Sequence, residues 1–93
     1  MRELFVWDSA KAASNLRKHR ISFEEGTSAF DDRSSITISD PDHSLGEQRY
    51  LLIGYSEHNR ILVVSHVERG RLVRIISVRV ATASERHLYE EKR

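Results

Sequence analysis

The chain has 93 residues, with 15 Lys and Arg against 14 Asp and Glu, so its formal net charge is only +1. This length predicts a single domain over residues 1–93, and the charge balance by itself does not indicate nucleic-acid binding. There is no cysteine, which excludes disulfides, thiolate zinc sites and cysteine nucleophiles. The N-terminus lacks the apolar core of a signal peptide, and no apolar run approaches the roughly 20 residues that span a bilayer, so we expect a cytoplasmic protein.

The N-terminal segment predicts a short strand followed by a helix. Residues 4–7 form an apolar run, and Asp8 then offers a side-chain oxygen that commonly caps a helix N-terminus. The alanine- and lysine-rich segment 9–20 follows as the helix. Trp7 just before it fits the hydrophobic core, although a base-stacking platform is the alternative. The residues near one face of this helix, at 3.6-residue spacing, are Ala12, Leu16 and His19.

A neighbouring polar face of this helix carries Lys11, Asn15 and Lys18. It is either solvated helix surface or a row of phosphate contacts, and both interpretations stay open. Farther along, Ser22 and Glu25 have the spacing of a capping box, so a second helix should run to about residue 30.

Two strands should follow, over residues 35–39 and 48–55, because both segments are rich in β-branched and apolar residues. The polar loop between them contains Asp40 and His43. Such a cluster could hold a metal ion, but aspartates in turns commonly bond nearby backbone N–H groups, and we favour that explanation.

Glu47 and Arg49 stand two residues apart at the edge of the second of these strands, so their side chains share a face. A carboxylate and a guanidinium in this arrangement can simply pair. They can also work together as a proton-transfer group and a charge-stabilising cation.

The segment 60–82 predicts the central hairpin of the sheet. Two long runs of aliphatic residues flank a break at 68–71, where Gly70 can adopt a positive φ. Both faces of both runs carry large aliphatic side chains, so we expect neighbouring strands at the edges and cover on both faces.

Three arginines and a histidine interrupt this hairpin: Arg69, Arg74, Arg79 and His66. A guanidinium is costly to bury unpaired, so each arginine should pair with a carboxylate or open onto a polar cleft. We interpret the hairpin as the floor of an anion-binding site. Strict alternation places Arg74 and Arg79, five residues apart, on opposite faces unless a bulge re-aims one of them.

Thr82 and Glu85 form a second capping box, which begins a short, highly charged C-terminal helix that should pack weakly. Helices therefore precede a run of consecutive strands joined by short turns. This order predicts an α+β fold with N-terminal helices packed on one face of an antiparallel β-sheet.

Three ordered blocks of residues resemble the BrnT family of toxins from type II toxin–antitoxin systems. The blocks are Phe5 to Asp8 with Lys11, Asn15, Lys18, His19 and Ser22 to Glu25; Asp31 and Asp32 with Gly46 to Arg49; and Leu62 to Val64, Glu68 to Gly70, Arg74 to Ser77, Arg79, Ala81, Thr82, Glu85 and Arg86. Two departures are visible. Gly26 stands where the family usually has alanine, and Val78 replaces a common small residue.

The resemblance implies a RelE-like fold and an endoribonuclease that cuts RNA and so inhibits translation, without a metal or another cofactor. It also implies a cognate BrnA-like antitoxin with a ribbon-helix-helix DNA-binding domain, joined in a 2:2 complex. Contact with operator DNA would then be made only through the antitoxin.

Metal-independent RNA cleavage uses the substrate's own 2′-hydroxyl as nucleophile, and needs proton-transfer groups and cations around the developing charge. We predict a catalytic set of Arg49, Arg79, Glu47, His66, Lys18 and His19, and a substrate-binding set of Arg69, Arg74, Lys11 and Asn15. The histidines and the glutamate are the candidates for proton transfer, without separate assignment of acid and base. The rival hypotheses are a non-catalytic RNA- or protein-binding module and a structural partner of a DNA-binding repressor.

Overall fold

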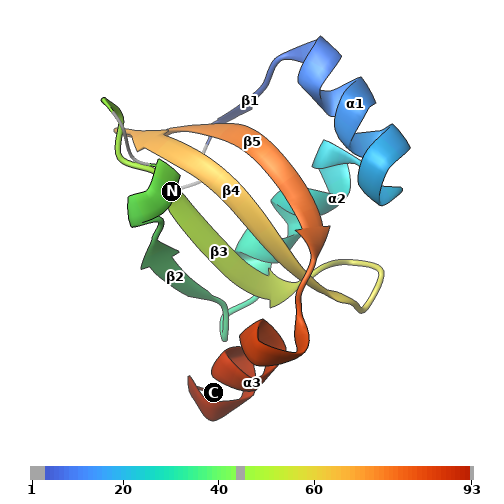
Figure 1. Cartoon of the computed structure of the whole chain (residues 1–93), viewed down its shortest axis with the longest axis vertical. Coiled ribbons are helices and arrows are strands. Elements are labelled where there is room, and N and C mark those ends of the chain that lie inside the picture. Colours follow the sequence, from blue (N-terminus) through green and yellow to red (C-terminus); the bar gives the residue numbers. More distant parts are fainter. Residues whose placement is uncertain (1–3, 44–45, 93) are drawn as a thin grey trace.

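The computed structural model describes residues 4–43 and 46–92 (Figure 1). The elements, in chain order, are β1 (Leu4–Val6), α1 (Ser9–His19), α2 (Phe23–Ser28), the short 3-10 helix η1 (Ala29–Asp31), β2 (Ile36–Ser39), the 3-10 helix η2 (Pro41–His43), β3 (Tyr50–Tyr55), β4 (Ile61–Arg69), β5 (Leu72–Val80) and α3 (Ala83–Lys92). The expected α+β fold is confirmed. Within the described ranges, no helix is long and apolar enough to cross a membrane.

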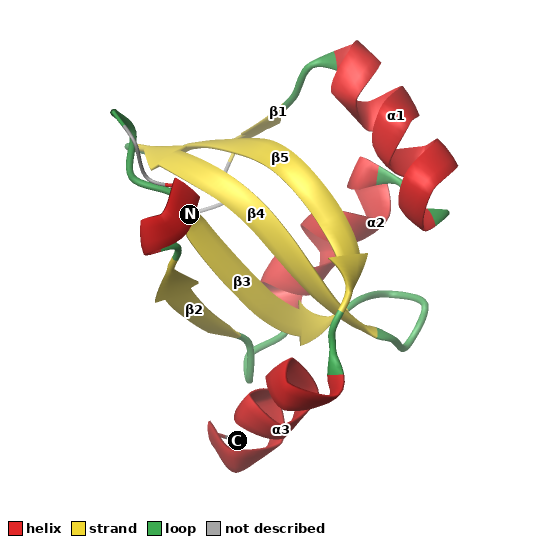
Figure 2. Cartoon of the chain, in the orientation of Figure 1, coloured by secondary structure: helices red, strands yellow, loops and turns green. Residues whose placement is uncertain are grey.

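The strands form one sheet in the order β1-β5-β4-β3-β2 (Figure 2). The β4–β5 hairpin is central, as predicted, and Gly70 at its turn has a φ of +59°. Neighbouring strands from β2 to β5 are antiparallel. The pairing of β1 with β5 is parallel, so the sheet is not antiparallel throughout.

A bulge in the central hairpin changes which face its side chains reach. Ser65 pairs with Ser77, but the next residue, His66, pairs with Ile75, so Ile76 is an extra residue in β5. Strand alternation is reset at this point. This reset decides which face is occupied by the two arginines of β5, because one lies on each side of the bulge.

Arg74 lies opposite Val67 and Arg79 lies opposite Val63. Val63 and Val67 are four residues apart on β4, so they share a face, and cross-strand partners share it too. Strict alternation would place Arg74 and Arg79 on opposite faces, but the bulge that was left open as an alternative is present, and Ile76 shifts the alternation by one residue.

The two faces of the sheet are covered differently. The helices α1 and α2 cover one face, where Phe23 packs with Val64, Ile75 and Val78. On the other face, Tyr89 of α3 packs against Ile53 and other residues at one end of the sheet. The N-terminal helices thus lie on one face, as expected, and the C-terminal helix adds cover to the other. The face that α3 covers only in part is called the open face below.

The packing of α1 also differs from the sequence-based expectation. Leu16 is 50% exposed and His19 is exposed, whereas Asn15 is 5% exposed. The side of α1 that touches β5 is therefore the one that carries Asn15, and a polar side chain occupies the contact. Trp7 packs against the core and meets the Phe23 ring edge to face, with 5.7 Å between centroids.

Candidate functional site

Two cavities that share lining residues form one groove, which runs from the open face across β5 to α1. The first, called the arginine cavity, has a volume of about 280 Å³ and is lined by Asp40, His43, Arg49, Leu51, Ser65, Ile76, Ser77 and Arg79. The second, called the lysine cavity, has a volume of about 170 Å³ and is lined by Lys11, Ser14, Asn15, Lys18, His19, Ile76 and Ser77. Because Ile76 and Ser77 line both cavities, they are the shared floor of the groove.

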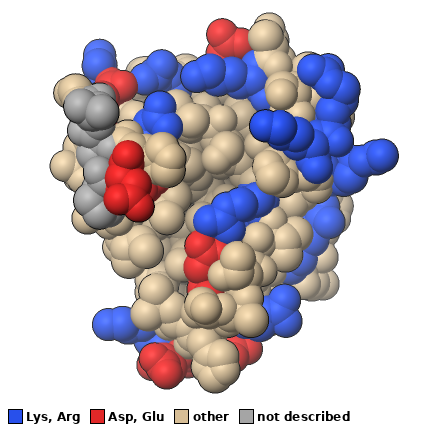
Figure 3. Space-filling model, viewed as in Figure 1, with Lys and Arg blue, Asp and Glu red and all other residues tan. Residues whose placement is uncertain are grey.

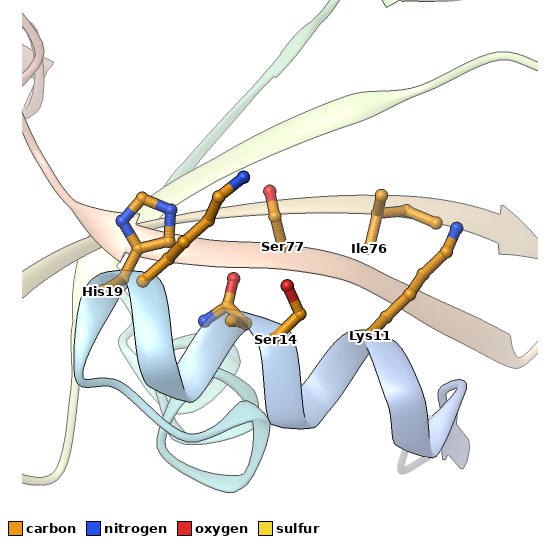
Figure 4. A pocket seen from close by; sticks show the side chains of 7 residues that line it. Lys11, Ser14, His19, Ile76 and Ser77 are labelled. Atoms are coloured by element: carbon orange, nitrogen blue, oxygen red, sulfur yellow. The ribbon is translucent and has the colours of Figure 1, made fainter.

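The groove brings cations from the first helix next to cations from the sheet. Figure 4 shows Lys11, Ser14 and His19 along the side of α1 that faces Ile76 and Ser77 of β5. In the space-filling view, Lys and Arg atoms gather over α1 beside a hollow in the middle of the sheet (Figure 3). A chain of net charge +1 thus presents a locally basic groove, which is the arrangement that an anionic ligand requires.

Asn15 is the residue that docks α1 onto β5. Its side-chain amide nitrogen donates to the carbonyl oxygens of Ile21 and Val78, at 3.0 and 2.9 Å, and its oxygen accepts from the Val78 N–H at 3.0 Å. The side chain thus behaves as a short piece of neighbouring strand along the edge of β5. These bonds place Asn15 beneath the groove as support for Lys11 and Lys18, although we expected it to bind substrate.

Arg79 is held in place by Glu85 of α3. Two guanidinium nitrogens of Arg79 donate to the two carboxylate oxygens of Glu85, at 2.7 and 2.8 Å. The hydrogen bonds from Arg79 lower the pKa of Glu85 to about 2, and the same pairing raises the pKa of Arg79. The Thr82 N–H also donates to Glu85, which completes the predicted capping box. Arg79 therefore enters the arginine cavity as a fixed cation.

Glu47, Arg69 and Arg74 form a separate ion-pair cluster, next to a cavity of about 300 Å³ lined by Val67, Arg69, Leu72 and Arg74. One carboxylate oxygen of Glu47 accepts from Arg69, and the other accepts from Arg74 at 2.7 Å. The hydrogen bond from Arg69 is the main reason why the pKa of Glu47 lies below its ordinary value. The carboxylate of Glu47 is thus already engaged.

His66 lies on the face covered by α1 and α2, away from the groove. It is fully buried, with its ring nitrogens 3.1 Å from the Val64 carbonyl oxygen and 3.0 Å from a Glu68 carboxylate oxygen. The ring of Phe30 packs edge to face against it, 5.0 Å between centroids. These contacts make His66 a part of the core, and the groove does not include it.

The groove also contains side chains that sequence reasoning did not select. Ser65 and Ser77 are cross-strand partners on its floor, and the only local signal was that they interrupt two apolar strands. Asp40 and His43 line its rim, although their spacing in a polar loop favours turn chemistry. Across the described residues, no group of three or more His, Cys, Asp or Glu is placed to hold a metal ion.

Comparisons with known proteins found a matching family and a similar crystal structure. The sequence profile of the family described as "Ribonuclease toxin, BrnT, of type II toxin-antitoxin system" matches residues 7–85. The fold is similar to the 1.1 Å crystal structure of the Brucella abortus ribonuclease toxin BrnT, with a TM-score of 0.67 and 21% sequence identity, over 88% of this chain and 99% of that chain. At this level of identity the likeness shows the fold alone. No curated protein sequence matches the chain.

Proposed function

The chain belongs to the BrnT family of ribonuclease toxins of type II toxin–antitoxin systems, and we propose that it is a cytoplasmic endoribonuclease that inhibits translation by cutting RNA. The observation that carries this proposal is the groove itself. Arg49 and Arg79 enter it from the sheet, while Lys11 and Lys18 enter from α1. A polyanion lying across the shared floor would meet cations on both sides.

The proposed reaction uses the RNA 2′-hydroxyl as nucleophile and requires no metal. The 2′-oxygen attacks the neighbouring phosphorus and the bond to the 5′-oxygen breaks, while Arg49 and Arg79 stabilise the charge that develops on the phosphate oxygens. Lys11 and Lys18 hold the flanking backbone, and His19 is positioned for proton transfer. The pairing of Arg79 with Glu85 supports this role, because a cation that is already fixed loses little freedom when substrate binds.

The proposed site is narrower than the set expected from the sequence. His66 and Asn15 are assigned to the fold, since both are buried and hydrogen-bonded within it. Glu47, Arg69 and Arg74 are assigned to partner binding, for the reasons given below.

The experiment that tests the proposal incubates purified, partner-free protein with a mixed RNA in excess EDTA. We expect wild-type protein to cut RNA, and Arg79→Ala to reduce the rate by about 10²- to 10³-fold, as removal of one charge-stabilising donor commonly does. Arg33→Ala is the matched control, because Arg33 is an exposed arginine that lines none of these cavities. Equal cleavage by wild type and Arg79→Ala would exclude Arg79 from the site. Cleavage that disappears in EDTA would overturn metal independence.

We propose that the partner is a ribbon-helix-helix antitoxin of the BrnA type, bound as a 2:2 complex and responsible for any contact with DNA. Its docking surface is supported by an exposed strip at the β1 edge of the open face, where Leu4 and Leu72 are paired neighbours. Arg69 and Arg74 border this strip. An acidic and apolar segment of the partner fits both features, and the carboxylate of Glu47 already occupies the position that a partner carboxylate would take.

Reversal of charge in the strip tests this docking surface. Arg74→Glu should weaken the complex with the co-expressed antitoxin by at least about tenfold, through lost pairing and new like-charge repulsion, while RNA cleavage by the free chain is retained. Unchanged affinity would place the antitoxin elsewhere.

The alternative function is a non-catalytic RNA- or protein-binding module. It is favoured by the fact that Arg74 and Arg79 are both engaged by carboxylates in the free chain. Alanine at His19 separates the two functions. An enzyme should lose cleavage and keep its RNA affinity, whereas a binding module has no cleavage to lose.

A further inference from the structure

The Asp40–His43 pair stands at the rim of the arginine cavity, beside Arg49 and Arg79. The His43 Nδ1 lies 3.0 Å from the Asp40 Oδ2, and their side chains are 65% and 15% exposed. The 3-10 helix η2 sets this distance, because its turn brings the His43 N–H within 3.3 Å of the Asp40 carbonyl oxygen. Asp40 is held in turn by its backbone N–H, which donates to the Arg49 carbonyl oxygen at 2.9 Å.

This arrangement determines which ring nitrogen of His43 can react. A carboxylate accepts hydrogen bonds only, so Nδ1 must carry the hydrogen that it donates to Asp40. In the neutral ring, Nε2 then has a free lone pair. A carboxylate in this position also stabilises the imidazolium that forms when Nε2 takes up a proton. The pair therefore has the composition and the geometry of a general base.

We propose that His43 is the general base of the RNA-cleavage reaction and that Asp40 is its positioning residue; this inference rests on the proposed ribonuclease function. His43 Nε2 takes the proton of the 2′-hydroxyl as the 2′-oxygen bonds to phosphorus. The bond from phosphorus to the 5′-oxygen breaks, and the leaving oxygen receives a proton from His19. The products are a 2′,3′-cyclic phosphate and a 5′-hydroxyl, with one proton gained by His43 and one lost by His19.

The placement of the two histidines supports this division. His43 lines the arginine cavity and His19 lines the lysine cavity, and the two cavities share Ile76 and Ser77 as floor. A phosphate above this floor would have one histidine on either side, as a displacement with attacking and leaving oxygens in line requires. Asp40 also adds, after Glu85, to the raised pKa of Arg79. The carboxylate that orients the base therefore also interacts with the cation of the arginine cavity.

The first test measures cleavage and binding separately. His43→Ala and Asp40→Asn should each lower kcat by about 10²-fold or more. RNA affinity, measured with a non-cleavable strand carrying a 2′-deoxy nucleotide at the cut site, should stay within about twofold. His58→Ala is the matched control, since His58 is an exposed histidine of the β3–β4 turn that lines neither cavity. Circular dichroism and thermal melting should show that every variant is folded.

The second test separates base from acid. A substrate with sulfur in place of the 5′-bridging oxygen has a thiolate leaving group, which needs no proton because a thiol has a pKa of about 8.5. This substrate should restore most of the rate of His19→Ala and little of the rate of His43→Ala. The inference is overturned if His43→Ala cleaves like wild type, if sulfur restores its rate, or if its RNA affinity falls as far as its rate. Failure of the wild type to cleave RNA would overturn the proposed function together with this assignment.

Discussion

His66 and His43 are histidines with oxygen partners on a ring nitrogen, but they lie on opposite faces of the sheet and in contrasting surroundings. His66 is fully buried on the face covered by α1 and α2, with both nitrogens within hydrogen-bond distance of oxygens of the fold. His43 is 65% exposed at the groove on the open face, with one nitrogen bonded to Asp40.

The same contrast holds for the other polar side chains. Asn15, at the contact of α1 with β5, is buried and hydrogen-bonded to backbone, and Glu25 of α2 is buried and paired with Arg60. In the part of the chain that the structure describes, no buried side-chain nitrogen or oxygen lacks a partner. Buried polar groups of this kind stabilise one arrangement of the elements, whereas Lys18 and His43 on the open side are accessible to a ligand. Residue type alone does not distinguish the two roles.

The largest effect that tests this contrast should come from His66→Ala. Removal of the fully buried ring leaves a cavity beside Phe30, so the free energy of unfolding should fall by about 3 kcal/mol. Urea denaturation measures this loss. Cleavage per folded molecule should stay within a few-fold of wild type, unlike that of His43→Ala. His66→Gln, which keeps polar groups in the site, is the milder variant; a folded His66→Gln protein that cannot cut RNA would return His66 to the catalytic set.

The next largest effect on stability should come from Asn15→Ala. It leaves the Val78 N–H and the carbonyl oxygens of Val78 and Ile21 without their partner, at a cost of about 2 kcal/mol in the free energy of unfolding. Ser14→Ala is the matched control, because Ser14 lines the same cavity and is half-buried on the same helix. If Asn15→Ala instead kept full stability and lost RNA affinity, Asn15 would be a substrate contact after all.

Much of the fold was predictable because its signals are local. The N-cap at Ser22 begins α2, the capping box at Thr82 begins α3, and the turn at Gly70 joins β4 to β5. Each of these features depends on residues within a few positions of one another. Helix caps and hairpin turns therefore leave a readable pattern in a single sequence.

The features that build the groove were not predictable in this way. The bulge at Ile76 falls within an unbroken aliphatic run, where an extra residue changes no visible alternation. It nevertheless decides that Arg74 and Arg79 share a face. Likewise, Asn15 is satisfied by the backbone of Val78, 63 residues away, and no local spacing reveals such a partner. The sequence therefore identified most of the cations but not their arrangement.

Gly26 and Val78 provide a smaller test, within the covered face. A Cβ added to Gly26 would lie 2.5 Å from the Val78 Cγ2, which is too close for a stiff β-branched side chain to accommodate without a shift. Gly26→Ala alone should therefore destabilise the chain by about 1 kcal/mol despite the better helix propensity of alanine. After Val78→Ala has removed the obstructing methyl groups, Gly26→Ala should instead stabilise the folded chain.

The coupling between these two substitutions, from urea denaturation of the four proteins, should be about 1–2 kcal/mol. It would explain why the two departures from the family pattern occur together, since a glycine at 26 makes room for a valine at 78. Additive effects would mean that α2 shifts away from β5 without cost.

The smallest expected effect belongs to the ion pair that joins α3 to the open face. Bonding to Arg79 lowers the pKa of Glu85 from its ordinary 4.5 to about 2, so the folded chain holds this carboxylate ionised where the unfolded chain does not. The stabilisation is fully present above pH 4.5 and is lost as the pH falls toward about 2. Because Arg79 is 35% exposed, solvent screening should limit the loss to the order of 1 kcal/mol.

Glu25 also contributes to the loss of stability in acid, because the hydrogen bond from Arg60 lowers its pKa as well. The contribution of Glu85 is isolated by comparison of wild type with Glu85→Gln, in urea denaturation at intervals from pH 6 to pH 2. The variant should be less stable near neutrality and should converge with wild type in acid, while Glu90→Gln, an exposed position on the same helix, should run parallel to wild type throughout. A constant difference between Glu85→Gln and wild type would contradict the ion pair, because only an interaction that depends on the ionised carboxylate disappears when the carboxylate is protonated.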